Sequence, residues 1–141
     1  MSGRHPAVTG VLETALYVDD LARAGGFYER LLDARTLLTD ERMRALDVAG
    51  RQVLLLFLKR ASDGPNPVPG GVIPPHDADG RMHLAFAVPA DDLTAWETRL
   101  EDMGVAVESR VRAPRGGTSL YFRDPDGHLV ELATPGIWEV Y

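Results

Sequence analysis

The sequence predicts an α+β protein made of two tandem copies of a βαβββ unit. Residues 13–18 and 83–88 both alternate between large apolar side chains and smaller or polar ones, which is the period of a half-buried strand. Each segment is followed by a pair of aspartates and then by apolar residues at helical spacing. Because the same order recurs about 70 residues later, we interpret the two segments as an internal repeat.

The first unit is expected over residues 11–61, after a flexible tail over residues 1–10. Its opening strand is followed by Asp19 and Asp20, either of which can cap a helix. The apolar stripe of that helix comprises Leu21, Ala24, Phe27, Tyr28, Leu31 and Leu32. The three strands that complete the unit are predicted over residues 35–39, 43–48 and 52–58.

The segment between the units, residues 62–80, holds five prolines and four glycines. It is long for a connection in a compact domain, and such loops are usually functional or disordered. We therefore expect a linker loop that marks the boundary between the repeats.

The second unit is expected over residues 81–141. After the strand at 83–88, a helix with the stripe Leu93, Trp96, Leu100 and Met103 should end at Gly104. Further strands are predicted over residues 105–111, 119–122 and 129–132. The last two form a hairpin around an Asp-Pro-Asp-Gly turn, a sequence that favours chain reversal.

Composition excludes several functional classes. The 141 residues carry a formal net charge of −6, which argues against binding to nucleic acid or to an anionic membrane surface. There is no cysteine, so disulfides, thiolate metal sites and cysteine nucleophiles are excluded. Neither a signal peptide nor an apolar run of about 20 residues is present, so a cytoplasmic location is expected by default.

Three ionisable residues fall on the less crowded face of the predicted strands. Glu13 and His83 open the first strand of each unit, and Glu131 lies in the last strand of the chain. In all three strands the bulkier apolar side chains alternate onto the opposite face. If the bulky face packs against helices, the lean face is left open for a ligand cavity where these three residues could meet.

Four segments carry a resemblance to a known superfamily. They are Glu13-Thr-Ala-Leu-Tyr-Val-Asp-Asp-Leu, Gly26-Phe-Tyr-Glu-Arg-Leu-Leu, His83-Leu-Ala-Phe-Ala-Val and Tyr121-Phe-Arg-Asp-Pro-Asp-Gly-His-Leu-Val-Glu-Leu. With the repeat order, they resemble the vicinal oxygen chelate superfamily, which includes glyoxalase I, extradiol dioxygenases, fosfomycin-resistance transferases and bleomycin-binding proteins. The resemblance implies an open, cup-shaped mixed sheet around a divalent metal ion, with helices on the outer face, and a homodimer.

The resemblance also implies the metal ligands, which would be Glu13, His83 and Glu131. One imidazole and two carboxylates favour Mn²⁺, Fe²⁺, Ni²⁺ or Mg²⁺ and are also compatible with Zn²⁺. Three protein ligands leave positions for two oxygens of a small substrate. The chain departs from its relatives at Glu13, where dioxygenases and fosfomycin enzymes normally have histidine. It also departs at Leu54, where repeat symmetry places a fourth ligand of glyoxalase I.

Other residues are candidates for contacts with the substrate or for proton transfer. Tyr121 should share the concave face with Ser119 and donate a hydrogen bond to substrate, and Glu131 or Glu13 could move a proton if it leaves the metal. His76 either covers the site as a proton shuttle or lies in solvent. The residues considered as lining the substrate pocket are Tyr17, Leu54, His76, Arg115 and Trp138.

These expectations lead to two alternative functions. The favoured one is a divalent-metal-dependent enzyme acting on a small oxygen-chelating substrate, by lyase or isomerase chemistry. Ring-cleaving dioxygenation is less favoured because the first histidine ligand is replaced by Glu13. The alternative is a metal-free protein that binds a bleomycin-type antibiotic and confers resistance to it.

Overall fold

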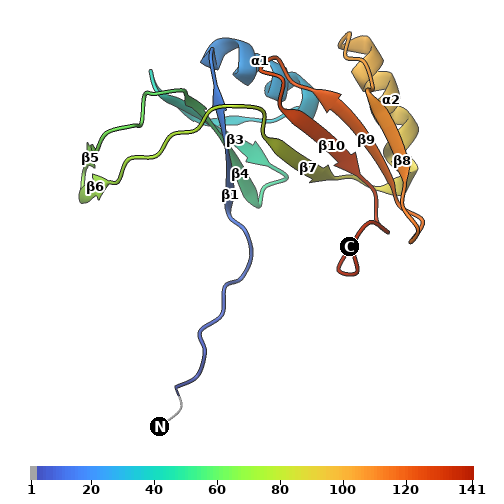
Figure 1. Ribbon diagram of the computed structural model, residues 1–141, viewed down its shortest axis with the longest axis horizontal. Helices are drawn as coiled ribbons and strands as arrows, with labels where there is room; N and C mark the ends of the chain where they lie inside the picture. The colour runs from blue at the N-terminus through green and yellow to red at the C-terminus, as the bar shows by residue number, and fades with distance from the viewer. Residues whose placement is uncertain (1–2) are drawn as a thin grey trace.

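The computed structural model describes residues 3–141 and shows two four-stranded sheets side by side, each accompanied by one α-helix (Figure 1). The first module consists of β1 (Glu13–Val18), α1 (Leu21–Leu32), β2 (Thr36–Thr39), β3 (Met43–Val48) and β4 (Gln52–Leu58). The second consists of β7 (His83–Ala87), a 3₁₀ turn (Ala90–Asp92), α2 (Leu93–Asp102), β8 (Ser109–Arg112), β9 (Thr118–Arg123) and β10 (Leu129–Ala133).

The two sheets have the same connectivity. Their strand orders are β1-β4-β3-β2 and β7-β10-β9-β8, and in each sheet the first strand runs parallel to the last while the other neighbours are antiparallel. Neither sheet closes on itself. The predicted α+β fold with two tandem βαβββ modules in an open mixed sheet is therefore confirmed.

The alternation predicted for the opening strand decides which of its faces is buried. Leu16 and Val18 are 1% and 0% exposed and join a core to which both modules contribute, whereas Ala15 lies on the other, open face. Helix α1 begins after Asp20, whose carboxylate accepts a hydrogen bond from the backbone N–H of Arg23 at 3.0 Å. The helix packs Phe27 and other apolar residues of its stripe into the same core.

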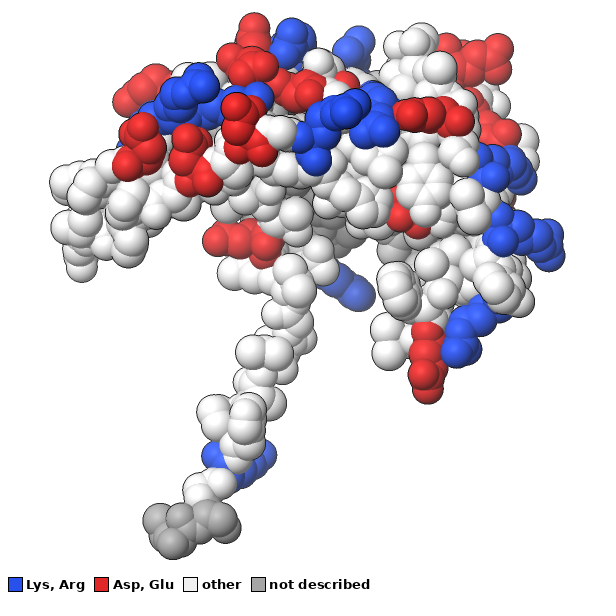
Figure 2. Space-filling view, viewed as in Figure 1, with Lys and Arg blue, Asp and Glu red and all other residues white. Residues whose placement is uncertain are grey.

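The connection between the modules contains a hairpin that sequence reasoning did not predict. Strands β5 (Asn66–Val68) and β6 (Gly71–Ile73) pair across a turn in which Gly70 has φ +97°. The hairpin projects from the body as an arm (Figure 1), and this arm carries no Lys, Arg, Asp or Glu over residues 64–75 (Figure 2). At its base, the backbone N–H of His76 donates to the carbonyl of Ser62 at 2.8 Å.

Two other segments differ from expectation. The strand predicted from residue 105 begins only at Ser109, because the N–H of Val105 bonds to Leu100 at the end of α2 instead of to a strand. The expected tail is exposed and without regular structure over residues 3–10, and its first two residues lie outside the described part of the chain. No helix in the described residues is long and apolar enough to cross a membrane.

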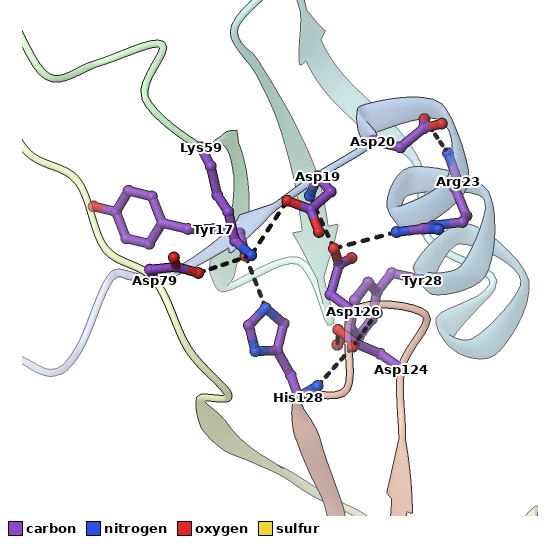
Figure 3. A network of polar contacts seen from close by, with 10 residues as sticks. All are labelled: Tyr17, Asp19, Asp20, Arg23, Tyr28, Lys59, Asp79, Asp124, Asp126 and His128. Carbon is purple, nitrogen blue, oxygen red and sulfur yellow. Dashed lines mark hydrogen bonds and ion pairs between the residues drawn. The ribbon is translucent and has the colours of Figure 1, made fainter.

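A partly buried polar network joins the second module to the first (Figure 3). The hydroxyl of Tyr28 in α1 donates to Asp124 Oδ2 at 2.6 Å, and the backbone N–H of Asp19 donates to Asp126 Oδ1 at 2.8 Å. Asp124 and Asp126 belong to the Asp-Pro-Asp-Gly turn, so this turn does more than reverse the chain. It holds α1 and the end of β1 against the second sheet.

His128, just after that turn, completes the connection. It is fully buried, and its Nδ1 accepts a hydrogen bond from the backbone N–H of Met82 at 2.9 Å. The proton therefore resides on Nε2, which donates to the carbonyl of Tyr17 at 2.8 Å. The imidazole of His128 therefore connects β1 to the residue that precedes β7 inside the molecule.

Candidate metal centre and ligand cavity

A backbone hydrogen bond determines which ring nitrogen of His83 carries the proton. Its Nδ1 lies 2.9 Å from the carbonyl oxygen of Leu129. Because a carbonyl only accepts hydrogen bonds, Nδ1 carries the proton, and Nε2 keeps a free lone pair in the neutral ring. That Nε2 atom lies 3.3 Å from Oε1 of Glu131, and the His83 side chain is half exposed, so the pair is open to a ligand from solvent.

Glu131 lies in the middle of β10 with its side chain only 9% exposed. Its Oε2 accepts a hydrogen bond from the hydroxyl of Ser119 at 2.5 Å. Ser119 lies two residues before Tyr121 on β9, and Tyr121 is the direct cross-strand partner of Glu131. The carboxylate is thus held by one oxygen while the other faces the imidazole.

The atoms of this pair fit a cation. A neutral imidazole nitrogen and a carboxylate oxygen both present lone pairs, so they repel each other unless a proton or a metal ion lies between them. A buried carboxylate without such a partner is costly. Metal-binding histidines commonly donate their other N–H to a backbone carbonyl, as His83 does to Leu129. The two donors are therefore of the types that metal sites use, and either a proton or a metal ion can lie between them.

Tyr121 lies beside the pair. Its ring centroid is 6.3 Å from that of His83, and its position opposite Glu131 in the β9–β10 ladder places both side chains on the same face of the sheet. The phenol of Tyr121 therefore borders the His83–Glu131 pair.

Glu13, the third expected ligand, lies on the other sheet. It opens β1 and lines a cavity of the first module together with Tyr17. Within residues 3–141, no group of three or more His, Asp or Glu side chains is placed to hold a metal ion. A single copy of the chain therefore brings His83 and Glu131 together but leaves Glu13 apart from them.

The cavity of the first module has a volume of about 700 Å³. Its walls come from the open face of the first sheet and from the segment that begins at Ser62 and ends at His76. Tyr17 Oη and His76 Nδ1 are 2.7 Å apart inside it, so the structure places His76 over the cavity rather than in open solvent. Burial, and then the negative charge of Asp77, raise the pKa of the Tyr17 hydroxyl, so it stays protonated at neutral pH.

The assignment of the fourth ligand position to Leu54 is off by one residue. Leu54 is 1% exposed and packs in the core. Ala15 pairs with Leu55 in the first module as Ala85 pairs with Glu131 in the second, so Leu55 is the equivalent of Glu131. The shift arises because the β3–β4 turn spans residues 49–51 whereas the β9–β10 turn spans residues 124–128.

Two further pocket candidates lie outside this cavity. Arg115 is exposed in the tight turn between β8 and β9, where the N–H of Ala113 bonds to the carbonyl of Gly117. Trp138 is 72% exposed in the turn that follows β10. The sequence analysis gave no role to Ser119 or Phe57. A serine within an otherwise apolar and aromatic strand could have indicated that Ser119 has a specific polar contact.

Comparison with known proteins gives several relatives. The chain is 32% identical to Metallothiol transferase FosB of Bacillus licheniformis over 133 residues, which cover 94% of this chain and 79% of that protein. It is 40% identical to Glutathione transferase FosA of Serratia marcescens over 60 residues, or 43% of this chain and 40% of that one. The crystal structure of Lactoylglutathione lyase from Agrobacterium tumefaciens matches with a TM-score of 0.85 and 33% identity, covering 95% of this chain and 99% of that one.

The family comparison agrees with the repeat order and with the paired modules. The model of one superfamily matches residues 10–132, which include all the strands and helices of both modules except the last residue of β10. The chain therefore belongs to the Glyoxalase/Bleomycin resistance protein/Dioxygenase superfamily.

Proposed function

We propose that this protein is a divalent-metal-dependent enzyme that acts on a small substrate through neighbouring oxygen atoms. The observation that carries this proposal is the placement of His83 Nε2 3.3 Å from the buried carboxylate of Glu131, with Nδ1 committed to a backbone carbonyl. The names of its relatives, a metallothiol transferase and a lyase, are consistent with such chemistry.

The third ligand is Glu13, supplied by a second copy of the chain. Each copy holds His83 and Glu131 on its second sheet and Glu13 on its first. A symmetric homodimer in which the first module of each chain packs against the second module of the other would complete two equivalent sites. The set of one imidazole and two carboxylates suits Mn²⁺, Fe²⁺, Ni²⁺, Mg²⁺ or Zn²⁺.

The side chains around the centre suggest how the reaction proceeds. When bound, the metal acts as a Lewis acid that polarises a substrate oxygen. Ser119 anchors Glu131 through one oxygen, so Glu131 is better suited to hold position than to swing away. Glu13 is exposed at the start of its strand, so it is the better candidate to move a proton. Tyr121 donates a hydrogen bond to the substrate.

Lyase or isomerase chemistry is the favoured reaction class, because it needs only a polarised oxygen and a carboxylate that transfers a proton. Ring-cleaving dioxygenation is less favoured because Glu13 replaces the expected histidine. Thiol transfer, the reaction named for two of the relatives, is the second class to assay.

A metal-free binding protein for a bleomycin-type antibiotic is the alternative function. It is favoured by one observation, the mainly apolar cavity of the first module, which holds a ligand-sized volume without involving His83 or Glu131. A binder of this kind would keep its ligand affinity after chelation of metals, and Glu131→Gln would not affect it.

The proposal is tested by metal content. Purified untagged protein should bind one divalent ion per chain, measured by mass spectrometry and by titration with Mn²⁺, Fe²⁺, Ni²⁺ and Zn²⁺. His83→Ala should abolish this binding, while Glu108→Gln, which alters an exposed carboxylate paired with Arg123, should not. A wild-type protein that binds none of these ions would overturn the enzyme proposal.

Mixing two defective chains tests whether the site spans two copies. Glu13→Gln and His83→Ala each destroy the site in a homodimer, but a mixed dimer joins the intact Glu13 of one chain to the intact His83 and Glu131 of the other. Unfolding and refolding an equimolar mixture should restore metal to about one quarter of the sites, because half of the dimers are mixed and each has one intact site. No recovery, or a monomer by light scattering, would contradict the shared site.

A further inference from the structure

We propose that the cavity of the first module binds a neutral, largely apolar molecule, and that Tyr17 and His76 recognise a hydroxyl or carbonyl group on it. This inference rests on the proposed function in that it names the substrate class of the concave site. It makes a stronger claim, because it excludes phosphate-like and other dianionic ligands as the preferred occupants of this cavity when no metal is bound.

An aromatic wall lines one side of the cavity. Phe57 and His76 have ring centroids 4.5 Å apart at an interplanar angle of 72°, and Tyr17 stacks on Phe57 at 5.6 Å and 25°. Such offset and edge-to-face arrangements hold the three rings as one rigid surface. A flat apolar ligand can pack against it without requiring the rings to reorganise.

The rest of the lining is mainly aliphatic. Leu55 and Met43 face the cavity from β4 and β3. Leu37 and Leu38 at its edge are 46% and 53% exposed, which is unusual for two adjacent leucines. A volume of about 700 Å³ lies within the range of small-molecule sites. Covering this surface with an apolar ligand would remove it from water, which favours binding.

The polar contact that this cavity offers a ligand comes from the hydrogen-bonded pair Tyr17 and His76. If the Tyr17 hydroxyl donates to Nδ1, then Nε2–H of His76 remains a donor and the phenol oxygen remains an acceptor. If Nδ1–H donates instead, the Tyr17 hydroxyl and Nε2 exchange these roles. Either arrangement offers one donor and one acceptor, which suits a hydroxyl or a carbonyl group on the ligand.

The Tyr17–His76 pair is held in place before any ligand binds. The backbone N–H of His76 bonds to Ser62 at 2.8 Å, and the next residue, Asp77, accepts a hydrogen bond from the N–H of Arg60 at 3.0 Å. Both bonds anchor the segment that carries His76 to the end of the first sheet. Because the dyad is already formed, a ligand does not have to order it, which preserves binding free energy.

The charges in the cavity do not suit a dianion. Among the described residues that line it, Arg42 is the one cation, and Glu13 supplies a negative charge in the same cavity. A phosphate or phosphonate group is typically held by several charged donors, above all by arginines in bidentate geometry. When no metal ion is bound at Glu13, one arginine opposed by a carboxylate is a poor match for such a ligand.

The experiment uses three probes of nearly the same shape. These are 1-naphthol, 1-methylnaphthalene and 1-naphthylphosphonate, titrated into the full-length protein by calorimetry and by methyl NMR, with and without a chelator. The variants are Tyr17→Phe and His76→Gln, and the control is Tyr141→Phe, whose hydroxyl bonds to the backbone of Val88 and Ala133 outside the cavity.

In the presence of the chelator, we expect 1-naphthol to bind more tightly than either other probe and to shift the methyl signals of Leu37 and Leu55. Tyr17→Phe and His76→Gln should each weaken 1-naphthol about 5- to 10-fold, the effect of one lost hydrogen bond, and leave 1-methylnaphthalene unchanged. The Tyr141→Phe control should match the wild type with all three probes.

In the presence of the chelator, tighter binding of the phosphonate, failure of all three probes to bind, or equal effects of Tyr17→Phe on naphthol and methylnaphthalene would overturn this inference. Its failure is distinguishable from failure of the proposed function. Metal binding without probe binding would contradict only the ligand class, and chelator-resistant naphthol binding in a protein that takes up no metal would contradict only the metal-dependent enzyme.

Discussion

The Nε2 atom of His83 lies 3.3 Å from Oε1 of Glu131, across the parallel pair formed by β7 and β10. The two residues are 48 positions apart in the chain, yet the ladder sets His83 opposite Leu129 and so two residues away from Glu131 on the same face. The hydrogen bond of Nδ1 to Leu129 comes from the same pairing. Backbone register thus produces both the position of the imidazole and its tautomer.

The first prediction concerns Ser119, which holds Glu131 without being a ligand itself. Ser119→Ala should lower metal affinity about 10- to 100-fold, because removing a hydrogen bond that orients a ligand typically has an effect of this size. Isothermal titration with Mn²⁺ or Ni²⁺ measures it.

The matched control for Ser119→Ala is Ser109→Ala, a serine exposed on β8. It should leave metal affinity unchanged. If both serine variants bind metal like the wild type, Glu131 does not depend on Ser119 for its orientation.

The second prediction is a loss of stability at alkaline pH caused by Tyr28. Burial, and then the negative charge of Asp124, raise the pKa of the Tyr28 hydroxyl well above its usual 10.0. A tyrosine whose folded pKa is raised contributes stability that is full below the unfolded pKa and decreases as pH rises above it. As pH rises above 10 the unfolded chain releases this proton before the folded chain does, so the free energy of unfolding should fall in this range.

Tyr28→Phe provides the comparison. At pH 7 it should lower the free energy of unfolding by about 1.5–3 kcal/mol, because Asp124 loses a buried hydrogen bond to a charged group. Between pH 9 and 11 its stability should decline less steeply than that of the wild type. Urea denaturation across this range measures both effects, and parallel curves for the two proteins would refute the assignment.

The third prediction concerns His128, which joins the modules. His128→Ala leaves the N–H of Met82 and the carbonyl of Tyr17 without partners and opens a cavity where a fully buried ring had been. The expected loss is about 2–4 kcal/mol in the free energy of unfolding. His5→Ala, in the exposed tail, should cost nothing measurable. Thermal and chemical denaturation of the two variants should therefore separate them clearly.

The fourth prediction uses the two adjacent glycines of α1. A Cβ added at Gly26 meets nothing within 4 Å, so Gly26→Ala should stabilise the protein by about 0.5–1 kcal/mol through higher helix propensity. A Cβ at Gly25 would lie 2.8 Å from Cδ of Arg44 and displace that side chain from its ion pair with Glu29. Gly25→Ala should therefore gain less or be destabilising. Equal denaturation midpoints for the two variants would show that Arg44 adjusts without cost.

Local sequence patterns were enough to predict the repeated module and the placement of its elements. The strands at 13–18 and 52–58 were predicted with the bounds that β1 and β4 have, because alternation and apolar runs bounded by turn residues are local signals. The same alternation placed Tyr121 and Glu131 on one face. The module order and the superfamily followed from these signals together.

Contacts between residues far apart in the sequence could be assigned only from the tertiary structure. The contact of Tyr17 with His76 spans 59 positions, and the hydrogen bond of His128 to Tyr17 spans 111, so no local period encodes either one. The residue equivalent to Glu131 is Leu55, not Leu54 as the sequence repeat suggested. The turns before β4 and β10 differ in length, and this difference changes the strand register. The separation of Glu13 from His83 was likewise decided by how the two modules pack, since the repeat specifies each module but not their mutual placement.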